Sequence, residues 1–487
     1  MNYRFRTCSA LVLFSLLSMP ALAGDSPALR IADGPFLLHA NIDQQWGGHT
    51  FSYLLEGEGS LFWSATMYNP DGQTWGSLIG QYPKPGSVAQ QSVTSIIFNE
   101  PGVKSMTQPL MLRSNDGYIH IFIGMSHATD DPNYSPGTIR YFRSAEPEAI
   151  SQLVDRTELI PRVAPYNEFH LRMNASISRD GERAAIVILA ISKDGSVPFN
   201  TPVIFQADKQ GPDFVFRNPV NYAEPMGFFY PQIALTDSGT VIVGQLWDDP
   251  DRSITRLLQL DGAGKITYRE DLPATTDGNY WCCDLRPIAH DNWNTLVLYY
   301  NKYPKDKQDC RHEFWTYTPA TNTLTMRRSI SVPEGQINYG KWIPVSAQRS
   351  FFIHNPSMGT YEAYDGNLLD SGEPTQPPSN SDQHTLLTPS TPPATSLTSF
   401  GSFKSPFSLI SNQSIDSFSP ILTIPLPATN PTTYGYAGTA YTFVPNPLQG
   451  SLITQGASWF ATDCIPQKND PNERTRAALL LYRLNFP

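Results

Sequence analysis

The sequence repeats a loose pattern at intervals of about 50 to about 60 residues, a period typical of repeat architectures. Each copy has an aromatic-rich segment, an apolar strand, a turn containing Asp, Asn or Gly, and a second apolar strand. The copies begin, at nearly constant spacing, at Phe51, Gln108, His170, Tyr230, Tyr280 and Tyr339. A last copy is expected to begin near Gln449. Such a repeat predicts one large architecture of similar units rather than several unrelated domains.

The turns within the copies predict β-hairpins. Asn115-Asp116-Gly117 and Arg179-Asp180-Gly181 separate apolar runs, and such residues accept the positive φ that a tight hairpin turn needs. Two hairpins in each copy make a four-stranded blade, and a radial arrangement of blades hides most strand edges. The sequence therefore predicts an all-β fold, a seven-bladed β-propeller. A set of β-sandwiches with coincidentally similar hairpin spacing is the alternative.

The N-terminus resembles a bacterial signal peptide. Arg4 and Arg6 precede an apolar run from Cys8 to Met19, and Ala21-Leu22-Ala23 provides the small residues of a cleavage site. We expect cleavage after Ala23 and a secreted or periplasmic product. The apolar run is too short for a membrane span, and no later segment reaches the required length of about 20 residues.

The net charge argues against two classes of partner. Formal charge is −10 for the whole chain, and removal of Arg4 and Arg6 with the signal peptide makes it −12. This charge does not favour nucleic acid or anionic lipid, although a local basic groove could still exist. We expect a monomer with no membrane insertion.

The composition changes once along the mature chain. Between positions 371 and 400, more than half of the side chains are Ser, Thr or Pro, which leaves too little apolar surface for independent folding. We therefore expect a signal peptide at 1–23, blades 1 to 6 at 28–370, a Ser/Thr/Pro-rich linker or insertion at 371–440, and the last blade with its closure at 441–487.

Four cysteines remain after signal cleavage: Cys282, Cys283, Cys310 and Cys464. An even number in an oxidising compartment is compatible with two disulfides, for which three connectivities are possible. A Cys282–Cys283 pair is disfavoured because adjacent residues close such a ring only with strain. A link from Cys464 to the 282–310 region would tie the last repeat to the fifth. Metal binding is the rival, but no Cys-x-x-Cys spacing supports it.

The first two copies resemble a known family. Gln45-Trp46-Gly47-Gly48-His49-Thr50-Phe51 and the stretch from Gln108-Pro109-Leu110 to Gly124-Met125-Ser126-His127 are similar to BNR-4 type propellers, as is the run from Ile139 to Glu148. This family includes secreted polysaccharide lyases such as ulvan lyases. The resemblance covers about positions 40 to 150, and it implies the fold more strongly than the reaction.

In such lyases, the resemblance implies, His and Tyr remove the proton next to a uronic carboxylate while Arg or a cation neutralises that carboxylate. This sequence departs from the family pattern at three places, one of which is that the Arg expected at the end of the third blade's second strand is absent around Ala190. Met106-Thr107-Gln108-Pro109 stands where His-Asn precedes the Pro, and Phe169-His170-Leu171 replaces a Tyr-Pro opening. The second His of that blade is kept as His127. The departures weaken the case for the family's chemistry.

Six residues are candidates for the site. The catalytic candidates are His127, Tyr230 and His170, and the substrate-binding candidates are His49, Arg140 and Arg143. His127 follows a second strand and could act as base, acid or ligand, or could be a hydrogen-bonded loop residue. Aromatic residues at repeat openings often pack between blades instead. The two arginines are three apart on one strand and point to opposite faces, so at most one serves as a carboxylate clamp.

No sequence motif supports two related hypotheses, a sialidase and a Ca²⁺-binding loop. Sialidase propellers carry Ser-x-Asp-x-Gly-x-x-Trp turns, whereas Asp180-Gly181 and Asp194-Gly195 have Asp and Gly adjacent, as in ordinary hairpin turns. The acidic loop 247–251 offers oxygen ligands but lacks the spacing of a Ca²⁺ loop. No cofactor is expected, and a structural or carboxylate-bridging Ca²⁺ has no supporting motif.

The sequence favours a secreted, carbohydrate-active propeller that binds an acidic polysaccharide. Its 23 Tyr and 9 Trp suit the apolar faces of sugars. If the protein is an enzyme, a polysaccharide lyase is favoured over a glycoside hydrolase. The alternative is a non-catalytic glycan-binding or protein-interaction module, because propellers host many unrelated functions.

Overall fold

The computed structural model is built from β-strands and single turns of 3-10 helix in the part of the chain that it describes. It describes residues 30–43, 54–68, 75–84, 94–98, 109–124, 139–162, 168–191, 201–222, 228–249, 252–272, 279–288, 291–303, 310–331, 340–344, 350–357, 360–366, 422–425, 436–443, 456–465 and 476–486. The prediction of an all-β chain is confirmed for these residues. Within them, no helix has the length and apolar character needed to cross a bilayer.

The described strands form seven antiparallel sheets, which we number in chain order. Sheet 1 comprises β2 (Leu54–Glu56), β3 (Ser60–Tyr68), β4 (Trp75–Pro83) and β5 (Thr94–Phe98). Sheet 2 comprises β6 (Leu110–Arg113), β7 (Ile119–Gly124), β8 (Ile139–Glu146) and β9 (Ala149–Asp155). Sheet 3 comprises β10 (Glu168–Ile177), β11 (Arg183–Ile191), β12 (Thr201–Gln210), β13 (Asp213–Phe216) and β14 (Val220–Asn221).

The next three sheets repeat the same order. Sheet 4 comprises β15 (Phe228–Thr236), β16 (Gly239–Asp249), β17 (Arg252–Leu260) and β18 (Ile266–Asp271). Sheet 5 comprises β19 (Asn279–Pro287), β20 (Leu296–Tyr303), β21 (Arg311–Thr318) and β22 (Thr323–Ser331). Sheet 6 comprises β23 (Gly340–Pro344), β24 (Ser350–Ser357), β25 (Thr360–Gly366) and β26 (Leu422–Pro425).

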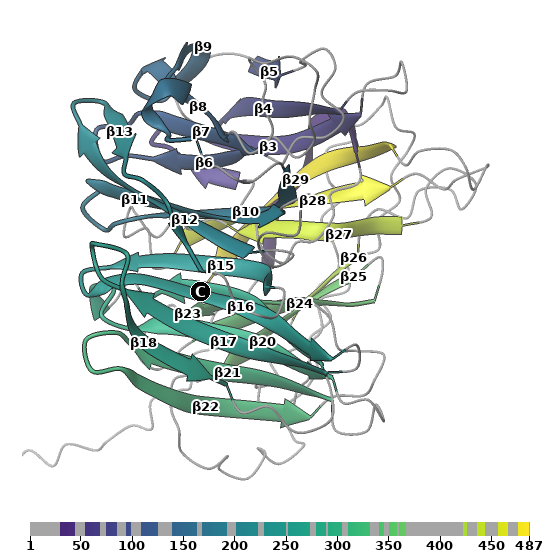
Figure 1. The fold of residues 1–487 in the computed structure, drawn as a ribbon. Helices are drawn as coiled ribbons and strands as arrows, with labels where there is room; N and C mark the ends of the chain where they lie inside the picture. Colours follow the sequence, from purple (N-terminus) through teal and green to yellow (C-terminus); the bar gives the residue numbers. More distant parts are fainter. Residues whose placement is uncertain are drawn as a thin grey trace, which may run out of the picture.

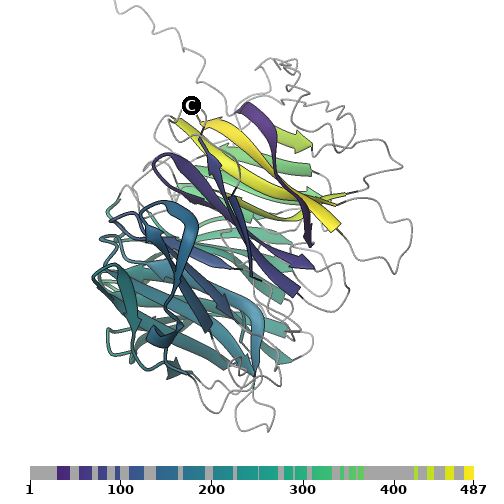
Figure 2. The ribbon, with the colours of Figure 1, turned by 90° about the horizontal axis from the view of Figure 1, so that it is seen from above.

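Sheet 7 joins the two ends of the described chain. It comprises β27 (Tyr436–Phe443), β28 (Gly456–Ile465), β29 (Arg476–Phe486) and β1 (Arg30–Asp43). Strand β1 pairs with β29, with Arg30 opposite Asn485 and Asp43 opposite Arg476. Figure 2 shows the purple β1 lying beside the yellow C-terminal strands. The N-terminal strand thus completes the last sheet.

In sheets 1 to 6, the first strand lies where neighbouring sheets meet. Contacts run in an unbroken series from β2 to β6, β10, β15, β19 and β23, and β1 contacts β3 of sheet 1. Figure 1 shows the sheets packed one upon another, with β10 of sheet 3 beside β15 of sheet 4. We call β6, β10, β15 and β19 the inner strands of sheets 2 to 5.

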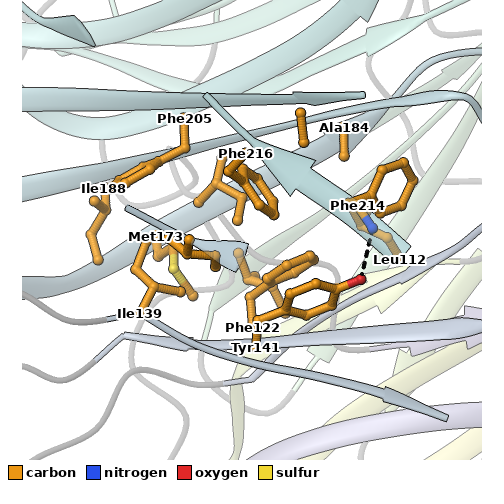
Figure 3. Packing of buried hydrophobic residues seen from close by; sticks show 14 of the residues in the cluster. Leu112, Phe122, Ile139, Tyr141, Met173, Ala184, Ile188, Phe205, Phe214 and Phe216 are labelled. Atoms are coloured by element: carbon orange, nitrogen blue, oxygen red, sulfur yellow. Dashed lines mark hydrogen bonds between the residues drawn. The ribbon is translucent and has the colours of Figure 1, made fainter. Parts of the chain in front are cut away.

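The hydrophobic core lies between neighbouring sheets. In β11, Ile186 and Ile188 pack toward sheet 2, whereas Val187 and Leu189 pack toward sheet 4. This alternation explains why the apolar run Ala184–Ala190 is continuous, since both faces of the strand are buried. Figure 3 shows the contact between sheets 2 and 3, where Phe122, Tyr141 and Phe216 cluster. Each fully buried aromatic or branched side chain stabilises the fold by about 1.5–3 kcal/mol.

The repeat is confirmed for six of the copies that the sequence predicts. The first strands of sheets 1 to 6 begin within three residues of the predicted starting points. The repeat pattern in the sequence did not predict three strands, which are β1, β26 and β27. β27 begins at Tyr436, before the predicted start near Gln449, and β26 also lies inside the range predicted as a linker. β1 belongs to sheet 7 rather than to the first copy, because its pairing joins distant parts of the chain.

The predicted hairpin turns are also confirmed. The backbone N–H of Gly117 donates to the carbonyl of Ser114 at 3.0 Å, and that of Gly181 donates to Ser178 at 2.9 Å. Both glycines have positive φ, 88° and 73°. These are the conformations that the Asp-Gly pairs predict.

Gly239→Ala will destabilise the protein more than Gly211→Ala, although both glycines have positive φ, 134° and 59°. A Cβ at Gly239 would lie 2.2 Å from the Leu260 carbonyl oxygen, whereas a Cβ at Gly211 would meet nothing within 4 Å. We expect a loss of about 1 kcal/mol at Gly211 and about 3 kcal/mol at Gly239 in urea unfolding. Equal losses of stability in the two variants would contradict the close approach of Gly239 to the Leu260 carbonyl.

Candidate functional site

Sheets 2 to 5 have tight turns at one end, which we call the turn end. It carries turns 114–117, 178–181 and 236–239 between first and second strands, and in sheet 5 the Ile288 N–H donates to the Thr295 carbonyl at the same place. The turns meet across sheets: Asn115 Nδ2 donates to Glu182 Oε1 at 3.0 Å, and Arg179 Nη1 donates to the Asn292 carbonyl at 3.3 Å. Because antiparallel strands alternate in direction, the opposite end is where every inner strand begins and every second strand ends. We call it the loop end.

Inner strands β10, β15 and β19 each contain an irregularity near the loop end. In β10 the register shifts between Phe169 and Met173, and in β15 between Phe229 and Gln232. In β19 it shifts between Cys282 and Asp284. Such bulges insert extra residues that lack a regular ladder partner, and they are over-represented next to active sites, where they redirect side chains. Three bulges at one level in three neighbouring sheets mark the loop end as the candidate site.

The sequence explains the bulge in β15. Pro231 lies inside the shifted segment and has no N–H for the ladder. A proline within a sheet is tolerated at an edge, at a strand start or at a bulge. The aromatic-proline pair at this repeat opening therefore selects an irregular backbone.

Polar side chains align the bulges of β10 and β15. Asn174 Nδ2 donates to the Pro231 carbonyl at 3.4 Å and to Gln232 Oε1 at 3.2 Å. Two residues further along, Ser176 Oγ accepts from the backbone N–H of Leu235 at 3.0 Å. Gln232 is 3% exposed, so these contacts are shielded from water. The two inner strands thus run side by side in the same direction, with their bulges at matching heights.

The structure brings two of the predicted catalytic positions to this level. His170 lies in the β10 bulge and Tyr230 in the β15 bulge. Their side chains lie outside the described part of the chain. His49 and His127 also lie outside the described residues, and His127 follows the end of β7 by three positions.

One basic residue at this level was not singled out in the sequence. Arg172 lies in the same β10 irregularity as His170. The sequence shows that Arg172 is charged. In a strand with regular alternation of faces, however, nothing would distinguish it from other polar strand residues. The bulge is what distinguishes it, and a bulge is a property of the pairing with β11 rather than of β10 alone.

Arg140 and Arg143 have separate partners on β8, the third strand of sheet 2. Arg140 Nη2 donates to Asp155 Oδ2 at 2.8 Å near the loop end. Arg143 Nε donates to Asp213 Oδ1 of sheet 3 at 2.6 Å, and its Nη1 donates to the Ser144 carbonyl at 2.7 Å. Arg143 is 6% exposed and stabilises the junction of sheets 2 and 3. Neither arginine belongs to an inner strand.

A buried polar chain lies farther toward the turn end. The Phe214 backbone N–H donates to Tyr141 Oη at 3.0 Å, and Tyr141 Oη contacts His120 Nδ1 at 2.8 Å. His120 Nε2 contacts Ser114 Oγ at 3.0 Å, and Ser114 donates to Asp116 at 2.5 Å. Each hydrogen bond of this chain has one donor and one acceptor only when His120 is neutral and carries its proton on Nε2. Tyr141 then donates to Nδ1, and Nε2 donates to Ser114. Burial lowers the pKa of His120 to about 3.

His120 will make the stability fall as the pH decreases below about 6.5. The imidazole is neutral in the folded chain down to a pKa of about 3 but gains a proton near pH 6.5 when unfolded. Stability present above pH 6.5 is therefore lost toward pH 3, at a slope of about 1.4 kcal/mol per pH unit. Urea unfolding between pH 6.5 and 4.5 should show a shallower slope for His120→Gln than for the wild type. Equal slopes for the two proteins would contradict the assignment of this pH dependence to His120.

The cysteines and acidic residues do not identify a metal site. Cys310 is buried, and the side chains of Cys282, Cys283 and Cys464 lie outside the described residues, so disulfide pairing stays a prediction. Among the described side chains, three or more His, Cys, Asp or Glu residues do not gather in a metal-binding arrangement.

No protein-family model and no curated protein matches the sequence. Among solved structures, the chain is similar to a PL25 ulvan lyase, a polysaccharide lyase, with a TM-score of 0.50 and 9% identity over 92% of this chain and 95% of that chain. The chain has a polysaccharide-lyase-like propeller fold. A PL25 ulvan lyase bound to -[GlcA(1-4)Rha3S]- gives a TM-score of 0.49 at 9% identity, covering 92% of this chain and 95% of that chain.

A neuraminidase-like protein is also similar to this chain. It is a subtype N11 neuraminidase-like protein of A/flat-faced bat/Peru/033/2010, with a TM-score of 0.40 and 11% identity over 91% of this chain and 96% of that chain. At these identities the comparisons concern the fold, so the reaction has to be argued from the residues of the loop end.

Proposed function

We propose that this protein is a secreted seven-bladed β-propeller that binds an acidic polysaccharide at its loop end and cleaves it by elimination. The observation that carries the proposal is the set of aligned bulges in β10, β15 and β19. Bulges redirect side chains where a regular strand would bury them in the sheet packing. The polysaccharide-lyase fold supports the class of ligand.

The proposed chemistry uses residue types that a uronate elimination needs. A base removes the proton beside the carboxylate, the negative charge spreads over the carboxylate as an enolate, and the glycosidic oxygen leaves from the neighbouring carbon with a proton. His170 or His127 would act as base, Tyr230 would donate the proton to the leaving oxygen, and His49 would contact the substrate. One product carries a new reducing end, and the other carries an unsaturated uronate at its non-reducing end.

A cation is required to stabilise the enolate. Arg172 is the arginine that the inner strands supply at bulge level, and its fork of N–H donors suits a planar carboxylate. Arg140, nearer the loop end of β8, is placed to contact a longer substrate at the rim. Arg143 contributes to sheet packing through Asp213.

The proposal is tested by incubating the purified protein with a panel of acidic polysaccharides. Absorbance of the unsaturated uronate should rise with a uronate-containing polymer. Reducing-sugar release without that absorbance would indicate a hydrolase instead. Binding on a glycan array without either signal would reject elimination and support the alternative, a non-catalytic glycan-binding module. The departures at Gln108 and His170 from the pattern of the similar lyases favour that alternative.

Export is tested separately from the chemistry. N-terminal sequencing of the product secreted by a bacterial host should begin at Gly24, the residue after the expected cleavage site. A product that keeps Met1 and stays inside the cell would contradict export.

A further inference from the structure

We propose that Cys282 and Cys283 form a disulfide with each other in the β19 bulge. The inference rests on strand positions in the described residues, and it holds or fails independently of the proposed function. The sequence alone disfavoured this pair because of its strain. The structure changes that assessment in two ways. It places Cys310 and Cys464 too far away to pair with Cys282 or Cys283, and it shows an irregular backbone in β19 between Cys282 and Asp284.

Cys310 is too far away to pair with either residue. It directly precedes β21, the third strand of sheet 5, whereas Cys282 and Cys283 lie on β19, the first strand. Two strand spacings separate them by about 9.5 Å, and a disulfide requires Cα atoms within about 7 Å. The register adds to this distance, because Lys302 pairs with both Tyr280 and Arg311 and so places Cys310 near the beginning of β19.

Cys464 lies in a different part of the fold. It is on β28 of sheet 7, opposite Ala437 and Ala478. Sheet 6 follows sheet 5 and contacts it through β23, while sheet 7 contacts sheet 1 through β1 and β3. Stacked sheets are about 10 Å apart, so a cysteine two sheets away is beyond disulfide reach. The same separation excludes a Cys310–Cys464 bond.

The bulge provides the backbone that an adjacent pair needs. In a regular strand, successive side chains point to opposite faces, so neighbouring cysteines diverge. Here Cys282 pairs with Tyr300 and Asp284 pairs with Tyr299, which leaves Cys283 as the inserted residue. An inserted residue is released from the ladder and can adopt the local turn that brings two adjacent sulfurs together. Strain remains, since adjacent Cα atoms are about 3.8 Å apart, and it makes the bond easier to reduce.

The oxidation balances through thiol–disulfide exchange. Both S–H bonds of Cys282 and Cys283 are broken, one S–S bond forms, and two electrons and two protons pass to a disulfide oxidant, which becomes two thiols. Oxidised glutathione is the probe for this step in vitro. The product is a redox-sensitive link in an inner strand, at the level of the bulges in β10 and β15.

Peptide mapping tests the bond. Full-length protein is equilibrated with oxidised glutathione, denatured without reductant, alkylated and digested. We expect alkyl groups on Cys310 and Cys464, and a peptide containing Cys282 and Cys283 that lacks them and is lighter by two hydrogens. Reduction should then allow two alkyl groups on that peptide. Alkylation of either residue before reduction, or a cross-link to another cysteine, would overturn the proposal.

Matched variants separate the bond from a general effect on folding. Cys283→Ser should make Cys282 accessible to alkylation without reductant, whereas Cys310→Ser should leave the adjacent pair unmodified. Tryptophan fluorescence of both variants reports whether they fold. If Cys310→Ser releases a thiol at Cys282 or Cys283, the adjacent pair is excluded.

Discussion

Under the proposed elimination, we expect Tyr230→Phe to lower kcat/KM for polysaccharide cleavage by about a hundred- to ten-thousand-fold, because a proton donor is lost. Tyr230 lies in the β15 bulge, at the loop end of an inner strand. The change removes one oxygen atom and keeps the ring, so the fold should remain. Initial rates from the absorbance of the unsaturated product measure the effect.

Tyr268→Phe is the matched control. Tyr268 lies on β18, the outermost strand of the same sheet, and its hydroxyl donates to Glu270 at 3.1 Å. Its loss should leave kcat/KM unchanged. Of His170→Ala and His127→Ala, the variant that removes the base should reduce kcat as Tyr230→Phe does. Arg172→Gln should also raise KM, because it weakens binding of the carboxylate. Full activity in Tyr230→Phe would remove this residue from the mechanism.

Glu148→Ala will destabilise the fold by about 3–5 kcal/mol, because it leaves a buried charge without its main partner. Arg113 is 7% exposed, and its Nε donates to Glu148 Oε1 at 2.7 Å. The same carboxylate accepts the backbone N–H of Glu58 at 2.8 Å from the first turn of sheet 1. One side chain thus joins sheets 1 and 2 at their turns.

Glu146→Ala is the control for this variant. Glu146 lies in the same turn of sheet 2 but is exposed. Its removal should change the free energy of unfolding by no more than about 0.5 kcal/mol. Urea unfolding of both variants measures the difference. Similar small losses would show that Arg113 is stabilised adequately by Glu58, whose side chain is 86% exposed and lies 3.4 Å away.

The sequence could predict strands and turns because both depend on neighbouring residues. The run Ala184–Ala190 is apolar at every position, and Asp180-Gly181 permits the left-handed turn before it. Spacing of such hairpins predicted the repeating sheets. Placement of β1 beside β29 could not be predicted this way, because it depends on a strand near the opposite end of the chain.

The candidate site was predictable only in part. His170 and Tyr230 were recognised as equivalent repeat positions, and the structure places both in bulges at one level. Arg143 looked equally suitable for a carboxylate, yet its partner Asp213 comes from the neighbouring sheet. A sequence shows the charge of a residue but does not show which distant carboxylate already neutralises it.

The sequence by itself determined that the chain is all-β and built from repeated hairpins, since alternation, aromatic content and turn residues act over a few positions. Tertiary structure alone decided which residues share the loop end, which arginines have partners in other sheets, and where the inner strands bulge. Those features arise from the register between strands and the packing between sheets, which are collective properties of segments far apart in the chain.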